Sequence, residues 1–156
     1  MEKEVFKLLE ELDIKYTIVN HPAVFTVKEA CKLVPKTDGL GCKNLFLEDD
    51  KKNFYIYVLP EKDMANFDYL SNILNISKIR FASEIDLYIK TKLHRGSVTP
   101  LGILNNDDKD VTVILDQKLT GKKILIHPNV NTQTLSMEFV DLLKIIDYNK
   151  NKYKIV

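Results

Sequence analysis

The sequence lacks the features that mark membrane-spanning and secreted proteins. No apolar run approaches the roughly 20 residues that a bilayer-spanning helix needs. The N-terminal stretch mixes acidic with apolar residues, whereas a signal peptide has a basic segment followed by an apolar one. We therefore expect a cytoplasmic protein that makes no contact with a membrane.

Cysteine and histidine are too scarce and too scattered to form a disulfide framework or a metal site. The two cysteines, Cys31 and Cys42, lack the spacing of paired metal ligands and the density of a secreted disulfide scaffold. The three histidines, His21, His94 and His127, lie far apart and lack the H-x-x-x-H spacing of zinc sites. We expect reduced thiols, no metal and no cofactor.

An excess of charge of one sign is also missing. With 23 basic and 22 acidic side chains the net charge is +1, which gives no broad positive field for wrapping duplex nucleic acid. Any contact with nucleic acid must therefore be local. The chain has no Walker lysine, dinucleotide fingerprint or G-x-S-x-G elbow, so nucleotide hydrolysis, hydride transfer and esterase-type triads lose their usual support.

The length and the apolar spacing predict one domain, 1–156, with alternating helices and strands. Helices are predicted over 5–12, 25–34, 66–74, 83–89 and 138–146. Strands are predicted over 16–25 (broken by an Asn-His-Pro turn), 42–47, 53–59, 78–82, 110–117, 122–128, 132–137 and 152–156. Since the strands arrive mostly as hairpins and meanders, we predict an α+β fold with a mixed, mainly antiparallel sheet.

The stretch "GLGCKNLF" is the first of three segments that could carry chemistry. Its two glycines permit close approach of a ligand to the backbone, and Lys43 stands beside Asn44 at the mouth of a predicted strand. A lysine there can meet a phosphate or carboxylate as a point charge, although it could equally be a solvated strand end. Cys42 is expected to pack as a small hydrophobe, because strand neighbours point to opposite faces.

The second segment, "HPNVNTQT", follows an apolar strand. His127 at the end of that strand could bind a ligand or move a proton near neutral pH. Asn131, Thr132 and Thr134 supply neutral donors and acceptors. The alternative is that "HPN" forms an ordinary turn.

The third segment, "LHRGSVTPLG", combines a glycine that permits unusual backbone angles with a proline that rigidifies the exit. Such a loop can aim several main-chain N–H groups at one oxygen, as in an oxyanion hole. The residue types alone also fit an ordinary loop.

Taken together, these segments resemble the YbaK/ProX family of aminoacyl-tRNA deacylases, and within it the prolyl-tRNA editing members. The resemblance lies in the order and spacing of "HPAVFTVKEA", "KNLFLEDDKKNFYIYVL", "IRFAS", "RGSVTPLGILNN", "VTVILDQKL" and "HPNVNTQTLS". It covers nearly the whole chain. The position before Gly96 is often proline in this subgroup and is Arg95 here.

The resemblance implies a sheet curved into a partial barrel with helices around it, and hydrolysis of the ester that joins a wrong amino acid, chiefly alanine, to proline tRNA. Lys43 matches the lysine on which family activity depends, and Asn44 its neighbour. Backbone amides of the family's G-x-x-x-P loop hold the substrate carbonyl, and here that loop comprises Gly96, Ser97, Val98, Thr99 and Pro100. His127, Asn131 and Thr132 match the motif beside the aminoacyl pocket.

The expected mechanism is attack by a water molecule, without a metal or a protein nucleophile, because an aminoacyl ester is already activated. The expected partners are the acceptor end of aminoacylated tRNA and, through it, prolyl-tRNA synthetase. Two alternatives remain open: a Cys-tRNA deacylase of the YbaK type, and a non-catalytic protein that binds tRNA ends or a small ligand. Local phosphate contacts could come from Lys51, Lys52, Lys92, Arg95, Lys122 and Lys123.

Overall fold

The computed structural model describes residues 2–23, 28 and 37–156, and its described strands form one eight-stranded sheet. The strand order is β1-β7-β6-β2-β3-β5-β8, and β4 pairs with β2 beside this path. The strands are β1 (Tyr16–Asn20), β2 (Leu40–Asp49), β3 (Phe54–Pro60), β4 (Ile79–Phe81), β5 (Val111–Leu115), β6 (Lys123–Ile126), β7 (Gln133–Glu138) and β8 (Tyr153–Ile155).

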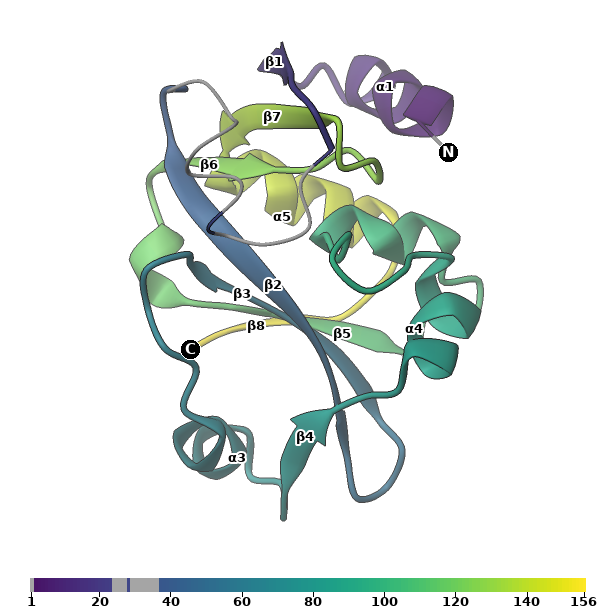
Figure 1. Cartoon of the computed structure of the whole chain (residues 1–156), viewed down its shortest axis with the longest axis vertical. Coiled ribbons are helices and arrows are strands. Elements are labelled where there is room, and N and C mark those ends of the chain that lie inside the picture. Colours follow the sequence, from purple (N-terminus) through teal and green to yellow (C-terminus); the bar gives the residue numbers. More distant parts are fainter. Residues whose placement is uncertain (1, 24–27, 29–36) are drawn as a thin grey trace.

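The sheet is mixed, as the sequence predicts. The pairings β1–β7, β2–β3, β2–β4 and β6–β7 are antiparallel, whereas β2–β6, β3–β5 and β5–β8 are parallel. β1 and β8 end the strand order without pairing with each other, so the described sheet stays open. The fold is therefore α+β, with helices around an unclosed sheet (Figure 1).

The long strand β2 joins the two halves of the sheet (Figure 1). Leu40 and Gly41 pair with β6, the segment 42–48 pairs with β3, and the segment 47–49 pairs with β4. Among the described strands, the edge of β2 that faces away from β3 is therefore unpaired between Gly41 and Leu47. β2 begins at Leu40, two residues before the predicted start, because of this short parallel pairing with β6.

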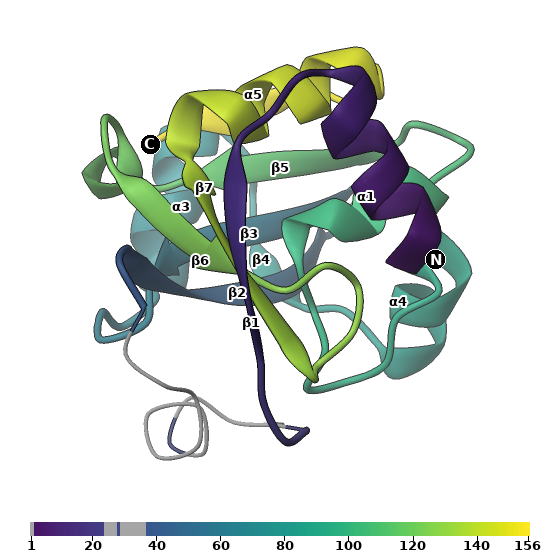
Figure 2. The same ribbon diagram turned by 90° about the horizontal axis from the view of Figure 1, so that it is seen from above.

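Four described helices surround the sheet: α1 (Glu2–Glu11), α3 (Phe67–Leu74), α4 (Glu84–Thr91) and α5 (Phe139–Tyr148). They agree with the predicted helices, and the predicted helix over 25–34 falls almost entirely outside the described residues. α1 and α4 lie on the same side of the molecule (Figures 1 and 2). Side-chain caps mark the N-termini of α3 and α4. The side chain of Asn66 accepts a hydrogen bond from Tyr69 N, and that of Ser83 accepts one from Asp86 N.

Two groups of buried side chains hold these elements together. The central core gathers apolar residues from α1, α5 and most strands, including Phe46 and Val58, and Leu101 from the segment after α4. The α3 core lies on the other face of β2 and β3 and includes Leu47, with Leu45 packed against it. Each fully buried side chain of this size contributes about 1.5–3 kcal/mol through the hydrophobic effect.

Two short 3₁₀ helices were not predicted. One, Pro100–Asn105, begins where Thr99 Oγ1 accepts a hydrogen bond from Leu101 N and Pro100 supplies a fixed φ angle. The other is Gln117–Leu119. Along the described ranges, no helix has both the length and the apolar character that a bilayer span requires.

Candidate active site

The loop from Gly96 to Pro100 is tied to the turn that follows β6. Thr99 is fully buried, and its Oγ1 donates a 2.7 Å hydrogen bond to the carbonyl oxygen of His127. Asn129 Nδ2 donates to the carbonyl oxygen of Leu101, just beyond the loop. The structure therefore brings together two of the three segments that the sequence singles out (Figure 2).

The backbone of this loop has the conformation that its glycine predicts. Gly96 has a φ of +85°, a region that residues with a Cβ rarely adopt. The amide of Ser97 closes a turn by donating to the carbonyl oxygen of His94 at 3.0 Å. Within the described residues, the amides of Gly96, Val98 and Thr99 donate no hydrogen bond. The set of free donors is thus smaller than the sequence suggests, because Ser97 N is engaged.

His127 is held in one tautomer by its surroundings. Its Nδ1 lies 2.8 Å from the carbonyl oxygen of Gln133, and a carbonyl can only accept, so Nδ1 carries the proton. Nε2 is then an acceptor in the neutral ring. Burial lowers the pKa of His127 below 6.5; the Gln133 carbonyl opposes this shift and the nearby His21 adds to it. The ring is therefore neutral at pH 7.

His21 is a site residue that sequence reasoning missed, since it considered this histidine only as a metal ligand. The His21 and His127 rings meet edge to face, with centroids 6.0 Å apart. His21 Nδ1 donates to the carbonyl oxygen of Pro22, and Nε2 accepts from the hydroxyl of Thr134, each at 2.8 Å. The pairing of β1 with β7 places residue 20 opposite residue 133 and so brings His21 to the turn between β6 and β7. The sequence alone does not show which strands pair, so it gave no signal for this position.

Asn131 and Thr132 lie in the turn between β6 and β7, and the strand predicted to begin at Thr132 begins at Gln133. Thr132 is exposed, and its carbonyl oxygen accepts a hydrogen bond from His21 N at 3.0 Å. Asn129 in the same turn was missed by sequence reasoning, although it is buried and adopts a φ of +63°. Among the described residues, Asn129 Oδ1 is a buried acceptor without a hydrogen-bond partner.

Lys43 is half-buried near the start of β2, opposite Leu59 of β3. Strand alternation places it on the face of Leu45 and Leu47, whereas Cys42 and Phe46 pack into the central core. The side chain of Lys43 forms no hydrogen bond or ion pair with a described residue. Lys43 also lies in the part of β2 whose edge away from β3 pairs with no described strand.

Asn44 lies on the face of β2 that packs into the central core. Val98 of the loop and Leu101 beyond it pack against the same core. Asn44 Oδ1 is a further buried acceptor that has no partner in the described part of the chain. Asn44 therefore shares a face with the loop, whereas strand alternation places Lys43 on the opposite face of β2.

Cys42 is a half-buried free thiol. Burial raises its pKa to about 12; a hydrogen bond from the Leu125 backbone opposes this shift and Glu61 adds to it. The thiolate required of a nucleophile is thus scarce at neutral pH. The space beside the neighbouring Gly41 is occupied by the carboxylate of Glu61, which a Cβ at this position would meet.

The candidate phosphate contacts differ in the charges around them. Lys52 is paired with Glu48 at 2.9 Å, and Lys123 with Asp38 at 3.2 Å. The side chains of Lys51, Lys92, Arg95 and Lys122 form no ion pair with a described residue. Of these, Lys92 and Arg95 lie beside the loop of Gly96.

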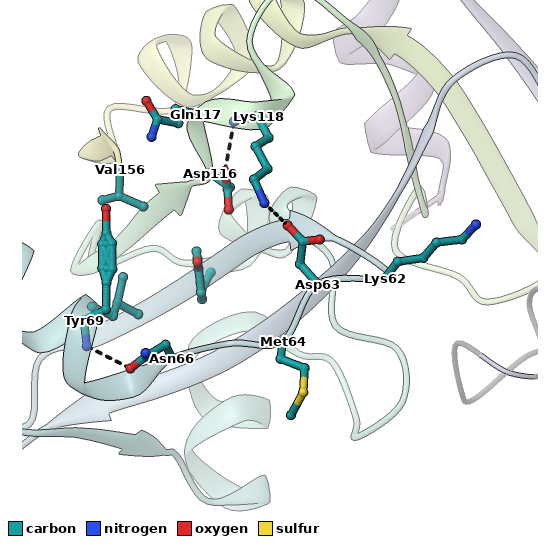
Figure 3. Close-up of a pocket in the computed structure, with 11 residues that line it drawn as sticks. Lys62, Asp63, Met64, Asn66, Tyr69, Asp116, Gln117, Lys118 and Val156 are labelled. Atoms are coloured by element: carbon teal, nitrogen blue, oxygen red, sulfur yellow. Dashed lines mark hydrogen bonds and ion pairs between the residues drawn. The ribbon is translucent and has the colours of Figure 1, made fainter.

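A cavity of about 470 Å³ lies elsewhere, between the start of α3 and the C-terminus (Figure 3). None of the expected site residues lines it. The ammonium group of Lys118 in this cavity is paired with a carboxylate, since Lys118 Nζ lies 2.7 Å from Asp63 Oδ2. Lys62 extends away from the other lining side chains (Figure 3). In the described ranges, no three His, Cys, Asp or Glu side chains gather into a group that could hold a metal ion.

Comparison with known proteins gives concordant results. The family of aminoacyl-tRNA editing domains matches residues 21–145. The chain is 34% identical over 157 residues to the prolyl-tRNA editing protein ProX of Acetoanaerobium sticklandii, covering 99% of this chain and 96% of that protein. It is 38% identical over 154 residues to prolyl-tRNA synthetase associated domain-containing protein 1 of Xenopus laevis, covering 92% and 90%.

Two solved structures share the fold. A candidate trans-editing enzyme for prolyl-tRNA synthetase superposes with a TM-score of 0.72 at 19% identity, covering 99% of this chain and 94% of that one. A hypothetical protein superposes with a TM-score of 0.75 at 15% identity, covering 98% and 97%.

Proposed function

The chain belongs to the family of aminoacyl-tRNA editing domains, and from this premise we propose that it hydrolyses mischarged proline tRNA in trans, with Ala-tRNA as its main substrate. The activity of the family makes the chain an aminoacyl-tRNA deacylase. The observation that carries the proposal is the 2.7 Å hydrogen bond from Thr99 to the carbonyl of His127, which fixes the amide-bearing loop beside a neutral imidazole.

The amides of Gly96, Val98 and Thr99 hold the carbonyl oxygen of the ester. Negative charge develops on this oxygen when water attacks, and preoriented N–H groups stabilise that charge more than they stabilise the ground state. Removing one such donor costs about 10²–10³-fold in rate in enzymes of known mechanism. Ser97 supports the loop through its turn with His94 instead of donating to the substrate.

His127 accepts a hydrogen bond through Nε2 from the ammonium group of the aminoacyl substrate. This role needs a neutral ring with a proton on Nδ1; burial favours the neutral ring, and the Gln133 carbonyl holds the proton on Nδ1. A protonated ring would place two positive charges side by side. Asn131 and Thr132 shape the same side of the pocket from the turn between β6 and β7.

Lys43 and Asn44 bind the nucleotide that carries the ester. Lys43 has no carboxylate partner in the described chain, so its ammonium group is available to the terminal phosphate. The buried Oδ1 of Asn44 accepts a hydrogen bond from a hydroxyl of the terminal ribose, which satisfies an atom that otherwise lies buried without a partner.

Hydrolysis then requires only water. The water oxygen bonds to the ester carbon, the bond from this carbon to the ribose oxygen breaks, and the ribose oxygen takes a proton. Alanine and uncharged tRNA leave. The second hydroxyl of the terminal ribose assists the attacking water, and Pro100 keeps the loop rigid during the reaction.

The amino acid is selected by size, because a pocket that admits alanine excludes the larger proline ring by steric overlap. The test is a panel of proline tRNA charged with alanine, cysteine, serine or proline. We expect rapid hydrolysis of Ala-tRNA and none of Pro-tRNA. A preference for Cys-tRNA would replace our substrate with that of the YbaK type, and binding without hydrolysis of any member would indicate a regulator.

A further inference from the structure

The segment just before the loop carries an exposed pair of aromatic rings. Tyr88 of α4 and His94 stack with ring centroids 5.2 Å apart and an interplanar angle of 29°. Tyr88 keeps 46% of its surface exposed, and His94 is also exposed. A stacked pair that stays accessible offers an aromatic face on which a nucleobase can stack.

The same surface carries positive charge that no acidic side chain of the described residues neutralises. Lys92 Nζ lies 5.3 Å from the centroid of the Tyr88 ring, and Arg95 is exposed beside His94. Neither forms an ion pair with a described residue. Lys90, two residues before Lys92, contrasts with them because Asp108 and Asp110 bind its ammonium group.

This surface adjoins the Gly96–Pro100 loop, because the turn closed by His94 and Ser97 connects the two. The carbonyl oxygen of His94 accepts the hydrogen bond of Ser97 N at 3.0 Å, and Gly96 lies between them. The segment after α4 runs toward the turn between β6 and β7 (Figure 2). A nucleic acid whose last ribose lies at the loop must continue over a neighbouring surface, and this one combines stacking faces with free cations.

We propose that Tyr88, Lys92, His94 and Arg95 bind the unpaired nucleotides that precede the terminal adenosine of the tRNA. The two rings stack on bases, and Lys92 and Arg95 contact the phosphates between them. This inference rests on the proposed function, because it takes the substrate to be a tRNA whose terminal ester lies at Gly96–Thr99. It adds the stretch of RNA that is bound and the residues that bind it.

The first experiment measures binding, without hydrolysis. An uncharged RNA hairpin with an unpaired CCA end is titrated against the wild type, the double variant Tyr88→Ala/His94→Ala and the exposed control Tyr148→Ala. We expect the double variant to bind about tenfold more weakly, as loss of base stacking predicts, and the control to bind like the wild type. All three should bind a blunt-ended hairpin equally.

The second experiment measures hydrolysis of two substrates. For Ala-tRNA, the double variant and Lys92→Ala/Arg95→Ala should raise KM. For alanyl-adenosine, which lacks the preceding nucleotides, both variants should match the wild type.

Unchanged binding of the CCA hairpin by the double variant would overturn the inference, and so would an equal loss on the blunt hairpin. If the wild type binds the CCA end through these residues but hydrolyses no charged tRNA, the proposed function fails and the inference stands.

Discussion

The hydroxyl of Thr99 and the carbonyl of His127, 28 residues apart in the chain, meet in a 2.7 Å hydrogen bond inside the protein. The bond joins the amide-bearing loop to the turn that positions the imidazole. Because Thr99 Oγ1 also accepts from Leu101 N, one side chain sets both the start of the 3₁₀ helix and the distance between the two parts of the site.

Thr99→Val keeps the shape of the side chain and removes both hydrogen bonds. We expect it to lower the free energy of unfolding by about 1–3 kcal/mol, because the His127 carbonyl is left without this donor. Activity on Ala-tRNA should fall further than stability alone explains. Thermal unfolding and deacylation are measured in parallel, and Thr99→Ser, which retains the hydroxyl, should stay near the wild type. Equal activity of the valine and serine variants would contradict the role of this bond.

Gly96→Val forces a branched residue into a φ of +85°. The loop must then change its backbone, and we expect kcat/KM for Ala-tRNA to fall by about 100-fold, the effect of losing an oxyanion-hole donor. Ser97→Ala leaves the backbone unchanged and should cost less than about threefold, since the engaged group is the Ser97 amide. A severe effect of Ser97→Ala would assign the chemistry to the hydroxyl instead.

Lys43→Ala should remove activity and leave the fold intact. The ammonium group has no partner among the described residues, so stability should change little, whereas loss of a charged hydrogen bond to phosphate costs about 10–100-fold or more in kcat/KM. Circular dichroism checks the fold, and deacylation of Ala-tRNA checks the activity. Lys62→Ala, an exposed lysine that forms no ion pair with a described residue, is the control. Normal turnover by a folded Lys43→Ala protein would refute the assignment.

The lowered pKa of His127 predicts how stability and activity depend on pH. Between pH 6.5 and the lower pKa of the folded state, the unfolded chain binds a proton that the folded chain does not, so stability falls as pH decreases through this window. KM for Ala-tRNA should rise at the acidic end, where the ring becomes charged. His127→Asn, whose amide can still donate to Gln133, should lose this part of both pH profiles. An unchanged profile in that variant would show that His127 is not the source of the dependence.

Cys42 should be dispensable. With a pKa of about 12, its thiol is protonated at neutral pH, so native protein treated with iodoacetamide should stay unmodified at Cys42. Cys42→Ala should retain activity within about threefold, because it removes only a small buried side chain at the edge of the core. Mass spectrometry of the peptide that contains Cys42 measures the first expectation. Rapid alkylation together with inactivation would point to a covalent mechanism.

Local sequence signals predicted most of the fold. Capping residues such as Ser83 mark helix starts, and alternating branched and aromatic residues mark β2 and β3, because these preferences act over a few neighbouring residues. The parallel pairings of β3 with β5 and of β5 with β8 were not predicted. Partners separated by whole elements are chosen by packing of the complete sheet, which no short window contains.

The candidate site shows the same limit. The segments around Lys43, Gly96 and His127 were singled out from residue types and resemblance, but the contacts that organise them were not. The engagement of Ser97 N by His94 and the edge-to-face contact of His21 with His127 both depend on how distant segments meet. Strand alternation alone, which is local, correctly separated Cys42 from Lys43.

The short pairing of β2 with β6 has a mechanical consequence. Lys43 belongs to the half of the sheet built on β3, and His127 follows β6 in the other half. Among the described strands, only Leu40 and Gly41 pair across these halves. A rotation of one half against the other would strain this two-residue pairing and would change the distance between Lys43 and His127.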